Sequence, residues 1–156
     1  MPVLEPAAVI ARLKATNRDL LALVSGAPPA QLVRSPGPEE WSPAMVVSHL
    51  ADAELVYSVR IRLMLTSDRP YLTAYEEAVW AKRFSQLDED AKESMGRWRS
   101  LRKANITLFE SLDDDEWTLS GLHAERGEVS VLAIAEVLAN HDRDHLSQIR
   151  QGLAVR

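Results

Sequence analysis

The chain has 156 residues, a formal net charge of −5 at pH 7 and no cysteine. This length predicts a single domain over residues 1–156. The lack of cysteine excludes disulfides, thiolate metal ligands and a cysteine nucleophile, and the negative charge argues against a nucleic-acid-binding surface. No apolar stretch approaches the roughly eighteen residues that a membrane span requires, and the N-terminus lacks a signal-peptide pattern. We therefore expect a cytoplasmic protein.

The first two predicted helices are separated by a loop rich in proline and glycine. Apolar residues at helical spacing predict a helix over residues 6–25. Ser42 is a good N-cap and Pro43 suits a first helical turn, so a second helix is expected from there to about Leu65. Its apolar stripe includes His49, which places this histidine on the inward face.

The segment after the second helix is less regular. A turn is expected around Pro70, and residues 75–80 predict a short helix. A third long helix is expected from about Ser85, with Asp88 in capping-box position. Its apolar stripe is the clearest in the chain and comprises Ala91, Met95, Trp98, Leu101, Asn105, Leu108 and Leu112.

Residues 113–127 are expected to form a loop before the last helix. That helix opens at Ser130 or Glu128 and ends at Gly152, and its inward stripe includes two histidines. Four long amphipathic helices without strand patterns predict an all-α protein with the architecture of a four-helix bundle.

Three of the four histidines lie on these inward stripes. His141 and His145 are four residues apart and so are neighbours on one helix face, and His49 lies on another helix. Imidazole is the commonest protein metal ligand, and three protein ligands leave a coordination position open, as in catalytic zinc sites. We therefore expect a divalent ion, Zn²⁺ or Ni²⁺, at His49, His141 and His145. The alternative is a metal-free bundle with hydrogen-bonded or surface histidines.

Other polar residues have both a structural and a functional interpretation. His123 lies between glycines and is either a solvated loop residue, which we favour, or a group that positions substrate. Arg60 shares the stripe of His49 and either meets an anionic substrate group or pairs with a buried carboxylate. Surface charge is the first interpretation for the basic run over residues 97–103 and for Asp52, Glu54, Asp142 and Asp144. The core or a pocket wall is expected for Trp41, Trp80, Trp98 and Trp117.

Several of these motifs occur together, in order, in one known family. Trp41-Ser42-Pro43 leads into a Val-Ser-His-Leu-Ala-Asp-Ala-Glu run over residues 47–54. The long third helix, the glycine-flanked segment over residues 121–127 and the His-Asp-Arg-Asp-His-Leu-Ser-Gln-Ile run over residues 141–149 follow. In these features the chain resembles the DinB superfamily, which includes YfiT-like proteins and thiol-dependent S-transferases.

The resemblance implies an up-down-down-up bundle, a divalent metal held by His49, His141 and His145, and frequent homodimers. Members with known activity add low-molecular-weight thiols such as bacillithiol or mycothiol to electrophiles, or isomerise maleylpyruvate with the help of a thiol. Others are regarded as metal-dependent hydrolases. Although the family name refers to DNA damage, no feature of this sequence supports DNA binding.

We therefore expect a metal-dependent enzyme, of the thiol S-transferase or hydrolase type, that acts on a small molecule. No catalytic residue is assigned, and Arg60 and His123 are the candidates for positioning the substrate or the thiol. The alternative is a non-catalytic, stress-related binding module whose metal is structural or adventitious.

Overall fold

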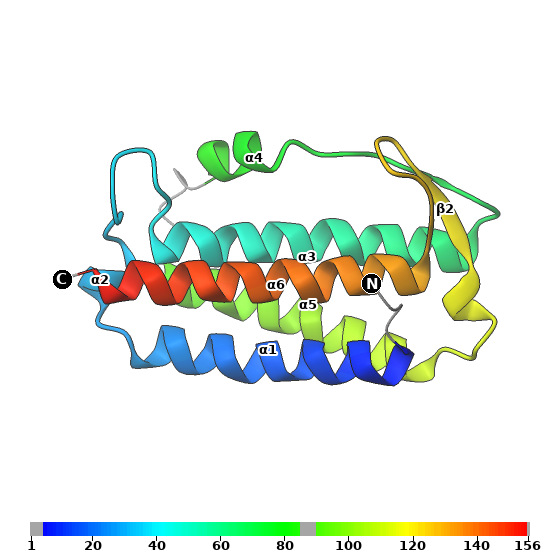
Figure 1. Ribbon diagram of the computed structural model, residues 1–156, viewed down its shortest axis with the longest axis horizontal. Coiled ribbons are helices and arrows are strands. Elements are labelled where there is room, and N and C mark those ends of the chain that lie inside the picture. The colour runs from blue at the N-terminus through cyan, green and yellow to red at the C-terminus, as the bar shows by residue number, and fades with distance from the viewer. Residues whose placement is uncertain (1–4, 85–89, 156) are drawn as a thin grey trace.

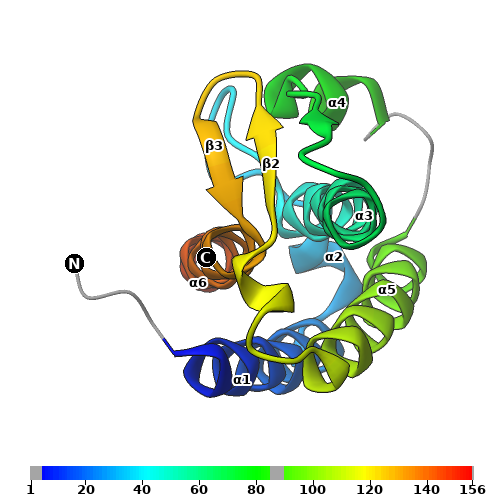
Figure 2. The same ribbon diagram turned by 90° about the vertical axis from the view of Figure 1, so that its right-hand side faces the viewer.

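Four long helices form a bundle in the computed structural model, which describes residues 5–84 and 90–155. They are α1 (Pro6–Gly26), α3 (Pro43–Thr66), α5 (Ala91–Ser111) and α6 (Val131–Ala154). Helices α1 and α3 each pack against both α5 and α6 (Figure 2). Helices α3 and α5 run in one direction and α1 and α6 in the other (Figure 1). The bundle is therefore up-down-down-up, as the resemblance implied.

Side-chain caps explain where three of the helices begin. Ser42 caps α3 by accepting from the backbone N–H of Met45, and Ser130 caps α6, which decides between the two predicted starts of the last helix. Asp90 and Glu93 form a capping box at the start of α5. The predicted start near Ser85 with its cap at Asp88, in contrast, lies outside the described residues.

The connection between α3 and α5 returns along the whole length of the bundle, because these neighbouring helices are parallel. It carries the short strand β1 (Tyr71–Leu72) and the helix α4 (Glu77–Phe84), and the latter lies beside α3 (Figure 1). The short helix predicted over residues 75–80 thus exists, shifted toward the C-terminus. This crossing segment covers one face of the bundle.

A small sheet replaces the loop that was predicted before the last helix. After a 3₁₀ turn, η1 (Glu116–Thr118), strands β2 (Ser120–His123) and β3 (Gly127–Ser130) form a hairpin, and β1 pairs in parallel with β2. Gly121 must be small, because a Cβ there would lie 2.9 Å from Cδ1 of Leu72 and 3.1 Å from the Pro70 carbonyl. Gly127 has a φ of +74°, which favours glycine in the hairpin turn.

Two apolar clusters fill the bundle, one around Phe109 and Leu138 and the other around Trp98 and Ile149. Buried polar residues lie between them along the helices, at Glu54, Arg102, Asn105 and Asp142. Burial of Trp98 and Trp117 confirms the core positions expected for these two tryptophans. No helix in the described ranges has the length and apolar character needed to cross a membrane.

Candidate metal centre

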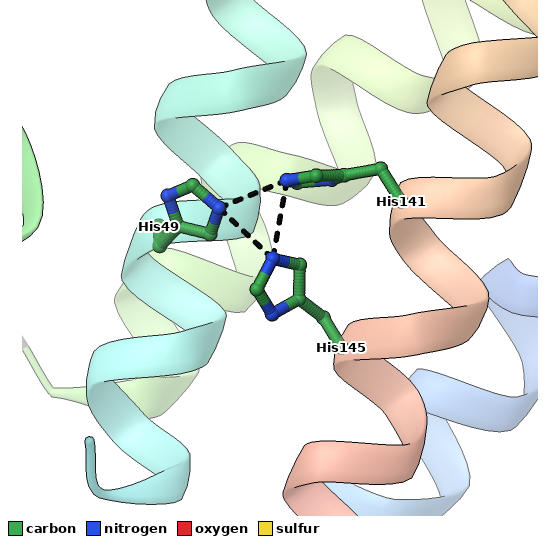
Figure 3. A group of neighbouring side chains, drawn as sticks. All are labelled: His49, His141 and His145. Atoms are coloured by element: carbon green, nitrogen blue, oxygen red, sulfur yellow. Dashed lines mark hydrogen bonds between the residues drawn. The ribbon is translucent and has the colours of Figure 1, made fainter. Parts of the chain in front are cut away.

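The three inward histidines meet between α3 and α6. His49 is in the second turn of α3, and His141 and His145 are one turn apart on α6. The Nε2 atom of His49 lies 2.9 Å from Nε2 of His141 and 3.1 Å from Nε2 of His145, and the latter two are 3.1 Å apart (Figure 3). The predicted convergence of His49, His141 and His145 is thus present in the structure. We call these three residues the histidine triad.

Hydrogen bonds alone cannot satisfy this triangle of nitrogens. An Nε2 atom of a neutral ring either carries a proton or presents a lone pair, so at least one of the three contacts pairs two lone pairs or two protons. Burial, with a smaller contribution from the charge of His145, lowers the pKa of His49 to about 4 and that of His141 to about 3. These two rings are therefore neutral at pH 7, the form that binds metals. The triad suits one ion that accepts three lone pairs.

The Nδ1 atoms of the three histidines have different surroundings. Nδ1 of His145 lies 2.8 Å from Oε1 of Gln148, which can accept its proton and leave Nε2 free to ligate. Nδ1 of His49 and Nδ1 of His141 are buried and have no hydrogen-bond partner among the described residues. Trp41 packs on the triad, with ring centroids 5.2 Å from His49 and 6.4 Å from His145, as expected for a pocket wall.

A carboxylate from the crossing segment stands beside the triad. Oε2 of Glu77, at the start of α4, lies 4.0 Å from Nε2 of His49, and the Glu77 side chain is 46% exposed. The sequence does not reveal this residue as part of the site, because its position depends on the path of the connection between α3 and α5. The only available signal was the predicted short helix that contains it.

A cavity of about 210 Å³ has Glu77 in its wall and comes near the triad through this residue, although no member of the triad lines it. Arg60 and His123 both line it, and both are buried. His123 is therefore not the solvated residue that we favoured, because β2 pairs with two strands and turns this side chain inward. Arg60 forms no ion pair within residues 5–84 and 90–155, which excludes the predicted salt bridge to a buried carboxylate there. Tyr57 and Tyr75 stand beside it in the wall.

A buried ionic network lies next to the triad, where surface charge was expected. The Arg102 side chain is fully buried and donates to both carboxylate oxygens of Glu54, at 3.0 and 2.6 Å, and to Oδ2 of Asp142 at 2.6 Å. Asn105 donates to Oε1 of Glu54 at 2.7 Å. The surface interpretation is wrong for these three charged residues, because each lies on a different helix and burial follows from their pairing.

Of the two remaining acidic neighbours of the triad, one is buried and the other lies at the surface. Asp52 is largely buried and accepts a hydrogen bond from Arg97 at 2.8 Å. Asp144 is exposed and pairs with Arg143, as predicted for surface charge. Burial raises the pKa of Asp142 to about 6 despite the opposing charge of Arg102.

Comparison with known proteins identifies the family. A family model described as the DinB superfamily matches residues 12–149. The chain belongs to the DinB superfamily. Among solved structures, it is similar to YfiT from Bacillus subtilis, with a TM-score of 0.85 and 21% identity over 94% of this chain and 85% of that one. It is also similar to TT2238, described as a four-helix bundle protein, with a TM-score of 0.66 and 22% identity over 94% and 99% of the two chains. These two likenesses support the fold.

Curated relatives from two bacilli share part of the chain. A protein of Oceanobacillus iheyensis is 26% identical over 114 residues, which are 73% of this chain and 65% of that protein. A protein of Bacillus cereus is 31% identical over 110 residues, 70% of this chain and 62% of that protein. Both carry the name "Putative metal-dependent hydrolase". The matched stretch spans less than two thirds of each relative.

Proposed function

We propose that this DinB-superfamily protein is a metal-dependent enzyme that acts on a small molecule, with His49, His141 and His145 as the ligands of one divalent ion. The observation that carries the proposal is the convergence of three Nε2 atoms at 2.9 to 3.1 Å. Three nitrogens on one side of an ion leave coordination positions for a substrate or nucleophile. The names of the relatives agree with this class of chemistry.

Zn²⁺ and Ni²⁺ are the ions that we propose, because imidazole ligands suit both. A divalent ion supplies Lewis-acid chemistry, since it lowers the pKa of a water or thiol that binds to it and makes either one nucleophilic at neutral pH. The chain has no cysteine, so a thiol would have to come from a small molecule. We also propose a cytoplasmic location, where such a thiol would be kept reduced.

Glu77 supplies the proton acceptor in this proposal. Its carboxylate is 4.0 Å from the His49 nitrogen and half-exposed, so it can accept the proton that the nucleophile loses and exchange it with solvent. We put hydrolysis, with water as the nucleophile, first because the relatives carry the name "Putative metal-dependent hydrolase". Transfer of a low-molecular-weight thiol to an electrophile is the second candidate, because the same acceptor serves a thiol.

Native metal content and turnover together test the proposal. We expect protein purified without an affinity tag to contain close to one divalent ion per chain by mass spectrometry. We also expect it to hydrolyse chromogenic esters or to conjugate a thiol with a chromogenic electrophile, and to lose this activity with a chelator. Turnover in the ester assay alone indicates a hydrolase. Stoichiometric metal without turnover in either assay would favour the non-catalytic binding module.

The resemblance also leads us to propose a homodimer. Light scattering after size-exclusion chromatography tests it, because a dimer of the 17.4 kDa chain has twice the monomer mass.

A further inference from the structure

The cavity beside the triad contains an unpaired buried cation. Arg60 is 5% exposed, and its guanidinium is a cation with five N–H donors. One amino group donates to the Thr73 carbonyl at 2.6 Å, but Nε has no hydrogen-bond partner in the described residues. Buried charges in proteins are ordinarily paired, so the structure leaves this cation without the anion that would balance it.

Two more donors line the same cavity. The Tyr75 hydroxyl is buried and has no hydrogen-bond partner within the described ranges. His123 accepts a hydrogen bond at Nδ1 from the backbone N–H of Glu125, at 3.2 Å, so its neutral ring carries the proton on Nε2. Burial and the charges of Arg60 and Arg126 lower the pKa of His123 and keep this ring neutral. The cavity wall thus offers three N–H or O–H groups.

Two arginines and two glutamates line the cavity, Arg60, Arg126, Glu77 and Glu125, and neither glutamate forms an ion pair with Arg60 in the part of the chain that the structure describes. Because these charges balance, the cavity favours an anion with a single negative charge over one with two. The two glutamates would repel a dianion such as a phosphate monoester more strongly than a carboxylate. Apolar side chains, among them Ile134 and Val137 of α6, form another part of the wall. They suit a hydrocarbon segment next to the anionic group.

Glu77 links the anionic subsite to the triad, because it lines the cavity and also approaches His49. Tyr57 lies eight residues after His49, which is about 12 Å along α3, and the Arg60 guanidinium lies over the Tyr57 ring at 5.4 Å from its centroid. A ligand held by Arg60 at one end would reach the triad past Glu77, if its two groups are separated by roughly 12 Å.

We propose that the substrate is a small monocarboxylate, whose carboxylate is bound by Arg60, Tyr75 and His123 while its reactive group faces the histidine triad. The assignment of a substrate rests on the proposed enzymatic function. Binding of the carboxylate itself depends only on the cavity.

Nuclear magnetic resonance tests the carboxylate subsite without an activity assay. The probes are hexanoate, hexanol and hexyl phosphate, titrated into ¹⁵N-labelled protein. We expect hexanoate to shift the Arg60 Nε–H and His123 ring signals, and hexanol to leave both unchanged. Equal binding of hexanoate and hexanol would overturn the proposal. Tighter binding of hexyl phosphate would overturn the choice of a carboxylate.

Variants separate the subsite from the metal centre. Arg60→Gln should weaken hexanoate binding roughly tenfold or more, whereas Arg69→Gln, at an exposed arginine, should leave it unchanged. An unchanged dissociation constant in Arg60→Gln would overturn the proposal. If that variant does not fold, Tyr75→Phe removes a single oxygen and should weaken binding about threefold. An unchanged constant in Tyr75→Phe would then overturn it.

Metal content distinguishes a failure of the carboxylate subsite from a failure of the proposed metal-dependent function. Arg60→Gln should keep the metal stoichiometry of the unaltered protein, because Arg60 is not a member of the triad. His141→Ala should lose metal and still bind hexanoate. If hexanoate binds but His141→Ala has the same metal content as the unaltered protein, the enzymatic proposal fails and the subsite stands. If metal binds at the triad and hexanoate does not bind, only the subsite fails.

Discussion

Arg102 on α5 donates to Asp142 on α6 at 2.6 Å, with both side chains buried, and Asp142 directly follows the metal-ligand candidate His141. The same guanidinium forms a two-point contact with Glu54 on α3, five residues after His49. One cation thus joins the two helices that carry the triad. The network fixes the rotation of α3 and α6 about their axes, and so helps to bring the histidines into register.

Replacing Arg102 should destabilise the protein strongly. Arg102→Met leaves Glu54 and Asp142 buried without their counter-ion, which costs about 3–5 kcal/mol in comparable sites. Urea denaturation measures the loss, and Arg143→Met provides the control, because Arg143 pairs with Asp144 at the surface and should cost less than about 1 kcal/mol. Equal stability of the two variants would contradict the structural role of the network.

Removal of one triad histidine should abolish stoichiometric metal binding while leaving the fold intact. His145→Ala removes a nitrogen at the edge of the site, where the residue is only half-buried, so helicity measured by circular dichroism should change little. Metal content by mass spectrometry is the decisive measurement. The matched control is His123→Ala, because His123 lines the adjoining cavity outside the triad and should keep its metal. Full metal occupancy in His145→Ala would argue against the three-histidine site.

Glu77→Gln should separate catalysis from metal binding. The amide cannot accept the proton of the nucleophile, and we expect kcat to fall by about 10² or more while metal content stays the same. Glu76→Gln is the control, since Glu76 is the exposed neighbour one residue earlier and lies outside the cavity lining in the described structure. If Glu77→Gln loses its metal instead, the residue is a ligand and not a proton acceptor.

The metal-free protein should lose stability as the pH falls from about 6.5 to 4. The pKa values of His49 and His141 are lowered to about 4 and about 3 in the folded state, whereas an unfolded chain has histidine pKa values near 6.5. The unfolded state therefore binds more protons in this window, and stability decreases on acidification.

Asp142 has the opposite effect on stability, because its pKa is raised to about 6 in the folded state. The stability that it adds on acidification is smaller than the stability that the two histidines together remove. Urea denaturation at pH 7.5 and pH 5 should therefore differ by on the order of 2 kcal/mol. His141→Asn should reduce the difference, since asparagine does not titrate. A metal-free protein that is equally stable at both pH values would show that these rings are not held neutral by the fold.

The helices and the triad could be predicted because both follow from periodicity. A period of 3.6 residues fixes which side chains share a face, and His49, His141 and His145 replace apolar residues on such faces. The sequence could not show that α3 and α6 meet at the same height. That match depends on the packing of four helices, which the resemblance to the DinB superfamily implied and the pattern did not.

The remaining parts of the site were hidden because they depend on contacts between distant segments. Considered singly, each charged residue of the buried network looks like a surface residue: Glu54, Arg102 and Asp142. Only their mutual ion pairs offset the free-energy cost of burying these charges. Strands of two to four residues are too short for an alternating pattern to be recognised. His123 was therefore interpreted as a loop residue, and Glu77 received no functional interpretation.

The histidines belong to long helices, whereas much of the wall of the neighbouring cavity comes from connections: the crossing segment with Glu77 and the hairpin with His123. The parallel pairing of β1 with β2 joins these two connections into one unit. Exchanging this unit would alter the cavity without altering His49, His141 or His145. In the proposed function, the chemistry and the choice of substrate would therefore depend on separate parts of the chain, and evolution could vary one while it preserves the other.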